Sequence, residues 1–244
     1  MLKRNIILLL ALVAVAGSVH AQARVGLKFG YNLGGVMADY RGDKTEDLKK
    51  NMGYPDNFRL KSGFQGGLIV DCPINDALAI QPGARFSMQG FIDKYANSSK
   101  HTRRFSLYYL QVPVYVQYRL NIAEETNVLF QAGPYFGYGL FGRQTYIRKG
   151  KTQDLNDNLK KITFGSGTAS DIRKGIDYGV GAGVGIEFYR FQLMATYDFG
   201  LYNMAFKKRL TGMYYDVDMR NHNFSVTLAV IFGRRDPLQG KNND

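Results

Sequence analysis

The sequence of 244 residues contains one cysteine, no tryptophan and three histidines, and these shortages exclude several kinds of site. A single thiol, Cys72, cannot form an internal disulfide and leaves no cysteine pair for a structural zinc site. Beyond the first 21 residues only His101 and His222 remain, and no acidic cluster accompanies them at a metal-binding spacing. We therefore expect no metal ion, no cofactor and no disulfide framework.

The sequence also lacks an apolar run long enough for a membrane-spanning helix. The longest run, Ile6–Ala16, has 11 residues, whereas a spanning helix needs about 20. Two basic residues precede the run, and small residues follow it before Gln22. This pattern predicts a secretory signal peptide over residues 1–21, cleaved between Ala21 and Gln22. A helical membrane anchor is the alternative, which the shortness of the run disfavours.

Acidic residues are scarce, with 20 Asp and Glu against 32 Lys and Arg, and the formal net charge is +12. A basic balance can indicate a nucleic-acid partner, but here the excess is dispersed along a chain that carries an export signal. An anionic lipid surface is the expected counterpart, and no nucleic-acid partner is expected.

Segment 107–120 shows a regular alternation of side chains. Apolar or aromatic residues occupy every even position from Tyr108 to Leu120, whereas polar residues such as Gln111 and Arg119 occupy odd ones. A period of two predicts a strand with one apolar and one polar face. Its length exceeds the roughly 5–6 residues of an ordinary strand and reaches the roughly 9–11 that a tilted strand needs to cross a bilayer.

Seven further segments repeat this pattern, and the connections between them alternate long and short. The eight segments are 24–34, 60–71, 77–91, 107–120, 127–141, 172–188, 189–202 and 223–233. Outer-membrane barrels have long outer loops and short periplasmic turns. The sequence therefore predicts an all-β fold, an eight-stranded antiparallel up-and-down transmembrane barrel over residues 22–233, with four long outer loops. A polar tail over residues 234–244 is expected to be disordered. A soluble β-sandwich is the alternative, but it does not explain the long–short rhythm.

Two local patterns within the predicted strands need separate comment. Pro113 and Pro134 cannot donate a ladder hydrogen bond, so we expect a β-bulge at each. Residues 137–142 formally match the glycine pattern of dinucleotide-binding loops. That motif requires a helix to begin within it, and these glycines lie within a predicted strand, so no nucleotide site is inferred.

Charged residues on the polar strand faces should point into the lumen. Side chains fill the interior of an eight-stranded barrel, and an unpaired buried charge is very costly. The predicted lumen network comprises Lys28, Asp71, Arg85, Arg119, Asp177, Glu187, Arg190 and Asp198. Alternate inward glycines from Gly179 to Gly185 are expected to make room for the long arginines. The network predicts a polar plug, and a narrow path for ions or solutes is the alternative.

Signs of catalysis are weak. His101 or His222 could serve as a general base in a lipid A-modifying barrel, with a nearby Ser or Asp. Polar loops contain such residues by chance, however, so we expect the protein not to be an enzyme. The candidate partners of the histidines in the sequence are Ser98, Ser99, Ser106, Asp216 and Asp218.

Three of the predicted outer loops are basic. Segments 92–104, 142–171 and 203–222 together carry a net charge of +8. Cationic loops at the outer rim could bind the phosphates of lipid A, so outer-membrane lipid, including lipopolysaccharide, is an expected partner. A merely solvated loop surface is the alternative.

Several segments resemble the PorT-type outer-membrane β-barrel family of Bacteroidetes across essentially the whole mature chain. They read VGLKFGYNLGG, LAIQPGARFSMQGF, LYYLQVPVYVQYRL, NVLFQAGPYFGYGL and DYGVGAGVGIEF. The resemblance implies a barrel in the outer membrane, and for some members a part in type IX secretion and gliding. No residue here matches a secretion-specific feature, and a polar tail follows Phe232. The expected function is thus a structural or interaction role with envelope protein partners, including that of an accessory to secretion. A small channel or a lipid A-modifying enzyme is the alternative.

Overall fold

The computed structural model describes residues 23–41, 57–94, 101–148, 151–152, 161–162, 164, 175–204, 208–210 and 213–233. The predicted signal peptide, its cleavage site and the polar tail lie outside these residues. No helix in this part of the chain is long and apolar enough to cross a membrane. The long strands are β1 (Arg24–Arg41), β2 (Asn57–Pro73), β3 (Leu78–Lys94), β4 (His101–Ala123), β5 (Thr126–Arg148), β8 (Ile176–Phe188), β9 (Phe191–Gly200) and β11 (Met213–Phe232). Three short strands, β6 (Lys151–Thr152), β7 (Lys161–Ile162) and β10 (Lys208–Leu210), pair with β5 or β11.

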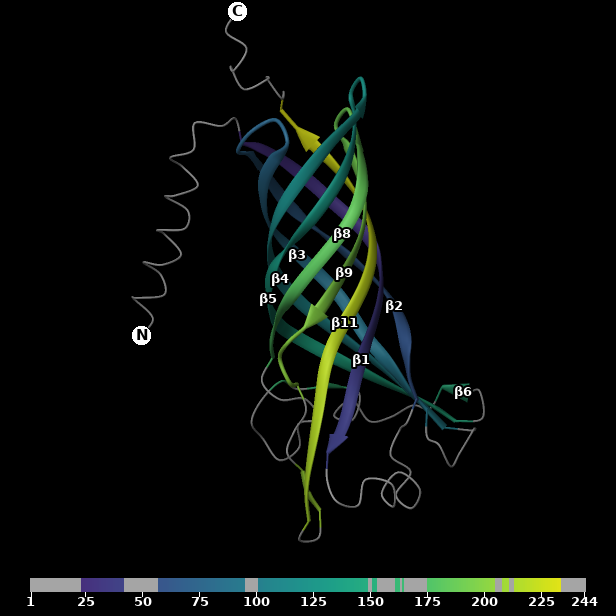
Figure 1. Ribbon diagram of the computed structural model, residues 1–244. Coiled ribbons are helices and arrows are strands. Elements are labelled where there is room, and N and C mark those ends of the chain that lie inside the picture. Colours follow the sequence, from purple (N-terminus) through teal and green to yellow (C-terminus); the bar gives the residue numbers. More distant parts are fainter. Residues whose placement is uncertain are drawn as a thin grey trace, which may run out of the picture.

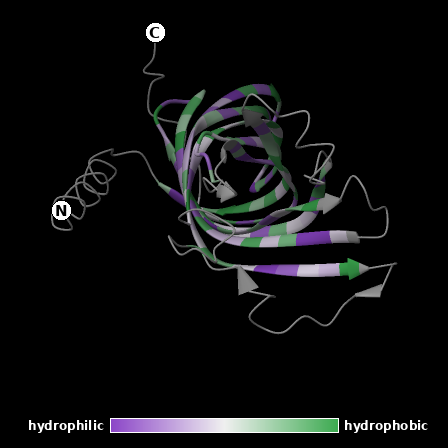
Figure 2. Ribbon diagram, turned by 90° about the horizontal axis from the view of Figure 1, so that it is seen from below, coloured by the Kyte–Doolittle hydropathy of each residue, from purple (hydrophilic) through white to green (hydrophobic). Residues whose placement is uncertain are grey.

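The eight long strands form a closed ring. Each pairs antiparallel with its neighbour in the order β1-β2-β3-β4-β5-β8-β9-β11, and β11 pairs back with β1. That closing ladder runs from Val25↔Phe232 to Arg41↔Asp216, and Figure 2 shows the ring around its lumen. Closure removes the free sheet edges. The predicted eight-stranded barrel is therefore confirmed, and the sandwich alternative is wrong.

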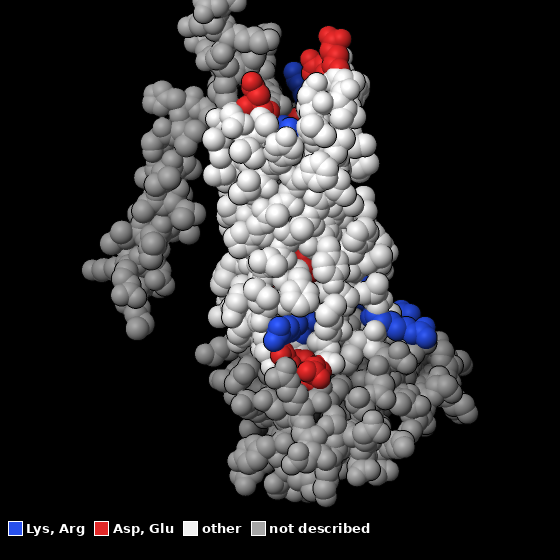
Figure 3. Space-filling model, viewed as in Figure 1, with Lys and Arg blue, Asp and Glu red and all other residues white. Residues whose placement is uncertain are grey.

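An apolar belt surrounds the barrel because the alternation of residue types matches the alternation of strand faces. Outward side chains such as Phe29, Val116 and Ile186 are 61%, 51% and 50% exposed, whereas inward Asp71 and Gln117 are 0% exposed. The belt covers every long strand and far exceeds the few hundred Å² of contiguous apolar surface usual on a soluble protein. Figure 3 shows a wide, almost entirely uncharged band on the visible face. Such a belt requires lipid around it.

The two ends of the barrel differ. The tight connections β2–β3, β4–β5 and β8–β9 lie at the end where β1 begins and β11 finishes, at the top of Figure 1. The longer connections leave from the opposite end, where several strands run past their predicted limits. For example, β11 begins at Met213 rather than at residue 223, and β5 continues to Arg148. By the loop-length rule, the end with the tight turns is periplasmic and the other is the outer end.

The expectation of bulges at Pro113 and Pro134 is wrong. Pairing on either side of each proline keeps the same register, and the register shifts of the β4–β5 ladder lie at Tyr108/Tyr109 and Asn121/Ala123. In an antiparallel ladder each residue directs its N–H toward one neighbouring strand only. A proline therefore removes one hydrogen bond, which the ladder absorbs without an inserted residue.

The ladder between β2 and β3 is interrupted near the outer end, with a register shift between Leu60 and Gln65. Asn32 reaches this gap from β1 and is fully buried. Its side-chain nitrogen lies 3.2 Å from the carbonyl oxygens of both Phe64 and Met88, and 3.0 Å from Oγ of Ser87. The amide thus provides a donor to carbonyls where the regular ladder is missing.

Candidate functional site: a filled polar lumen

The periplasmic end of the lumen contains two arginines and two carboxylates. Asp71 accepts hydrogen bonds from Arg24 at 2.6 Å on one oxygen and from Arg119 at 2.5 Å on the other. Glu187 lies 3.5 Å from Nε of Arg119 and 3.9 Å from Arg24, and accepts a hydrogen bond from Gln192 at 2.6 Å. Each side chain of this quartet is at most 6% exposed. We call these four charged residues the periplasmic quartet.

A second charged layer crosses the middle of the lumen. The guanidinium of Arg85 donates to Asp198 at 2.5 Å and to Oε1 of Gln111 at 2.9 Å. The hydroxyl of Tyr115 donates to the other oxygen of Asp198 at 2.7 Å. Lys28 is buried beside this group and lines a cavity of about 10 Å³ together with Arg85 and Tyr115, which is roughly the room that one water molecule needs.

The outer part of the lumen changes from polar to apolar. The carboxylate of Asp177 accepts hydrogen bonds from Asn221 at 3.1 Å and from the hydroxyl of Tyr135 at 3.4 Å. Asn221 also donates to the hydroxyl of Tyr109 at 3.3 Å. Beyond these groups the inward residues form an apolar cluster of Val36, Phe91, Phe105, Leu107, Tyr109 and Met204. An ion entering from outside therefore meets packed apolar side chains first.

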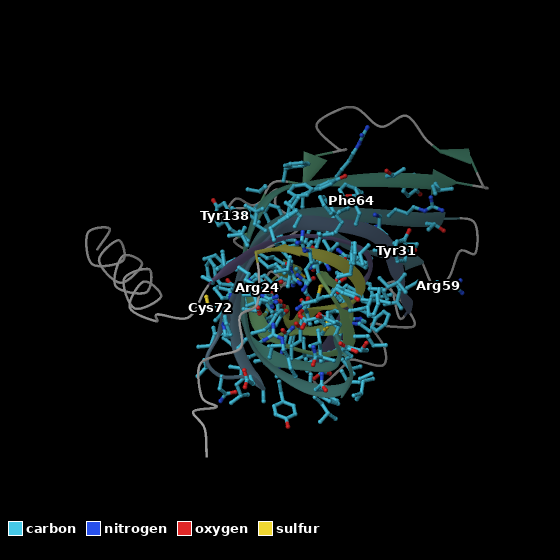
Figure 4. The ribbon with its side chains drawn as sticks, turned by 90° about the horizontal axis from the view of Figure 1, so that it is seen from above. Arg24, Tyr31, Arg59, Phe64, Cys72 and Tyr138 are labelled. Atoms are coloured by element: carbon cyan, nitrogen blue, oxygen red, sulfur yellow. The ribbon has the colours of Figure 1, made fainter. Side chains whose placement is uncertain are left out.

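Seven of the eight charged residues predicted for the lumen are buried there, and Arg190 is not. Arg190 is exposed in the tight β8–β9 turn, and its carbonyl oxygen accepts a hydrogen bond from the backbone N–H of Ile231. The prediction failed because the alternation of inward and outward side chains was extended through a turn, where it no longer holds. Arg24 takes its place in the network and points into the ring in Figure 4. Arg24 could have been identified from the sequence, because it is an even-numbered residue of β1 like the inward Lys28.

The inward glycines of β8 were expected to make room for arginines, but they do not. A Cβ on Gly181 would collide with the carboxylate of Asp198 and would lie 2.7 Å from the hydroxyl of Tyr115. A Cβ on Gly179 would lie 2.8 Å from the ring of Tyr135. The space is used by tyrosines and Asp198, because Arg85 reaches this wall only through Asp198.

The histidines lie far apart. His101 is on β4 and His222 is on β11, and these strands stand opposite each other in the ring. The half-buried ring of His222 lies 6.1 Å from that of Tyr197, whereas Ser106 is on the opposite wall, on β4. Ser98 and Ser99 lie outside the described residues. Among the residues that the structure describes, no group of three or more His, Cys, Asp or Glu could hold a metal ion.

A filled, charged lumen inside an apolar belt defines an integral membrane β-barrel of eight strands. The chain belongs to the outer membrane protein beta-barrel domain family, whose family model matches residues 18–205. Family membership places the protein in the outer membrane.

Solved structures of bacterial outer-membrane proteins are similar at low identity. The attachment invasion locus protein Ail of Yersinia pestis is 13% identical, with 86% of this chain and 99% of that chain covered and a TM-score of 0.38. OprG from Pseudomonas aeruginosa is 12% identical, with 88% and 98% covered and a TM-score of 0.47. Neisserial surface protein A is 12% identical, with 85% and 97% covered and a TM-score of 0.39. A comparison with curated protein sequences gives no match.

Proposed function

We propose that this protein is a non-conducting outer-membrane barrel whose role is structural or as an interaction partner of envelope proteins. The observation that supports this role is that three layers of side chains fill the lumen one after another. They are the periplasmic quartet, the Arg85–Asp198 layer and the outer apolar cluster. A permeating ion would have to separate charges that are already paired in a site with little water, which is costly.

Single-channel recording tests this proposal. We expect the full-length protein in planar bilayers to give no stable current steps, while an open porin in the same bilayers gives them. Reproducible steps from the pure protein would favour the second candidate, a small ion or solute channel. That candidate has one observation in its favour, which is the small cavity beside Lys28 and Arg85 in the middle layer.

A lipid A-modifying activity is not part of the proposal. Its general base would need an activated nucleophile or water close by, and the two histidines are on opposite strands, with the ring of His222 lying near Tyr197. An unchanged lipid A mass spectrum after deletion of the gene is the expected result.

The resemblance to PorT-type proteins makes an accessory role in protein secretion the first interaction role to test. Crosslinking in the intact envelope should then capture components of a secretion machine, and deletion should reduce the amount of its surface cargo. Normal secretion in the deletion strain would remove the support for this accessory role and leave the non-conducting barrel as a structural element.

A further inference from the structure

We propose that the outward surface at the outer end of β2, β4 and β5 binds the phosphate groups of lipid A. This phosphate-binding wall consists of Arg59, Arg104 and Arg143. It occupies one side of the barrel only, so the inference goes beyond a general preference of basic loops for anionic lipid.

An aromatic row marks the membrane side of this wall. Four outward rings from β2, β3, β4 and β5 follow one another around the barrel. Phe64 lies 6.3 Å from Phe86, Phe86 lies 5.8 Å from Tyr108, and Tyr108 lies 4.4 Å from Phe141. Aromatic side chains at this position on a barrel lie at the boundary between acyl chains and headgroups.

The basic residues stand just beyond that row. Arg104 is four residues outward from Tyr108 on β4, which is about 13 Å along the strand. Arg59 and Arg104 both pair with Ile92 in the ladder, and directly opposed residues share a sheet face. Both arginines are exposed, as is Arg143, and Arg59 points away from the barrel axis in Figure 4.

Lys61 lies at the same level of β2 but faces the lumen side, because it pairs in the ladder with Gly34, two residues from the buried Asn32. It is therefore not part of the wall, although its charge and that of Arg104 repel each other. Cations that lie close together repel each other unless an anion joins them. A phosphate at the wall would turn that repulsion into charge-assisted hydrogen bonds.

Acidic side chains are nearly absent from this wall. The outer ends of the four strands, residues 57–64, 86–94, 101–110 and 138–148, contain seven Lys and Arg but only one acidic residue, Asp93. Asp93 pairs in the ladder with Arg103, and Arg103 lies over the ring of the inward residue Phe105, so Arg103 belongs to the lumen face. Positive charge is therefore in clear excess within these segments.

The adjoining wall formed by β11 and β1 differs. On β11, Arg220 donates two hydrogen bonds to Asp218, at 3.1 and 2.7 Å, and Asp39 of β1 pairs with Asp218 in the ladder. Acidic groups thus stand beside the arginine there. A surface built only for solubility would have no reason to separate its charges between two walls in this way.

The occupant is a lipid because charge and apolar surface meet at this place. A phosphate-bearing lipid would lay its acyl chains on the belt below the aromatic row and present its phosphates to the three arginines. Lipid A phosphates lie in the outer leaflet, at the end of the barrel that carries this wall. At the periplasmic rim the exposed charged residues of the tight turns are Asp76, Glu124, Glu125 and Arg190, so their net negative charge disfavours the same lipid there.

Native mass spectrometry of the full-length protein in detergent tests the assignment. The protein is titrated with lipid A, with the same lipid A after enzymatic removal of its phosphates, and with lipid A in the presence of inorganic phosphate. We expect the variant Arg59→Gln/Arg104→Gln/Arg143→Gln to bind lipid A at least about tenfold more weakly, because three modest surface contacts are lost together. Dephosphorylated lipid A should bind the wild type as weakly as lipid A binds this variant.

Matched controls separate the site from a general charge effect. Arg190→Gln removes an exposed arginine at the other rim and should leave affinity unchanged, whereas Arg104→Gln should weaken it about threefold and Arg104→Lys should restore most of it. If the triple variant does not fold, these single variants decide the question. Equal binding of both lipids, equal loss in Arg190→Gln, or full competition by an equal concentration of free phosphate would overturn the proposal.

Discussion

At the scale of single residues, Asp71 holds the periplasmic quartet together, because its two oxygens bind different arginines. Asp71→Asn removes half of the countercharge from Arg24 and Arg119, which are 5% and 3% exposed. Leaving a buried charge without its partner typically costs about 3–5 kcal/mol. We expect this variant to lower the free energy of unfolding by about 3 kcal/mol, measured by urea unfolding from lipid vesicles.

Arg190→Gln is the control for Asp71→Asn, because it also changes one charge near the same end of the barrel. Arg190 is exposed, so its loss should change the free energy of unfolding by no more than about 0.5 kcal/mol. Equal effects of the two substitutions would contradict the view that the quartet is shielded from solvent.

The alternation of side chains along each strand predicted most of the residues that face the lumen, but it did not predict their partners. Lys28, Arg85 and Asp198 follow from their positions in alternating segments. The link between Arg85 and Asp198 does not, because β3 and β9 are not neighbours and only the size of the ring brings them together. The same limit explains why Tyr115 was not recognised as a donor to Asp198.

At the scale of elements, the tight β4–β5 turn contains strain that can be removed. Glu125 has a φ of 57°, and the left-handed region costs a residue with a Cβ about 1–2 kcal/mol. Glycine adopts this conformation without that cost, although it loses more entropy on folding. We expect Glu125→Gly to raise the free energy of unfolding by roughly 1 kcal/mol, measured as an increase in the urea midpoint.

Glu124→Gly is the matched control, because Glu124 is exposed in the same turn and is not among the residues with a positive φ. Glycine at this position relieves no backbone strain, so Glu124→Gly should lower the free energy of unfolding by roughly 0.5–1 kcal/mol. A gain from both substitutions would show that loss of acidic charge, rather than backbone strain, is responsible.

The sequence predicted the number of long strands, and it located the periplasmic turns within a few residues. It failed at the outer ends, where β11 starts 10 residues before the predicted segment, at Met213 instead of 223. Residues 213–222 include Asp216, Asp218 and Arg220, so they have no continuous apolar face. A strand outside the lipid needs no such face, and ladder pairing extends it, with β1 from Asp216 inward and with β10 over Met213 to Tyr215.

At the scale of the whole molecule, the asymmetry of the connections fixes how the barrel sits in the outer membrane. The tight turns and the described ends of the chain, near Arg24 and Phe232, lie at one end. The alternation of long and short connections between the predicted strands was enough to predict this arrangement. The side of the barrel that carries the phosphate-binding wall could not be predicted, because it depends on which strands become neighbours after closure.

Cysteine labelling tests this orientation in intact cells. In a Cys72→Ser background, Met37→Cys places a thiol at the outer end of β1, where Met37 is 47% exposed, and Glu124→Cys places one in the β4–β5 turn. A maleimide attached to a polymer too large for porins should modify the first variant in whole cells and the second only after the outer membrane is permeabilised. Labelling of Glu124→Cys alone in whole cells would mean that the barrel is inverted, since loop length would then point to the wrong side. Labelling of both would mean that the belt does not span the membrane.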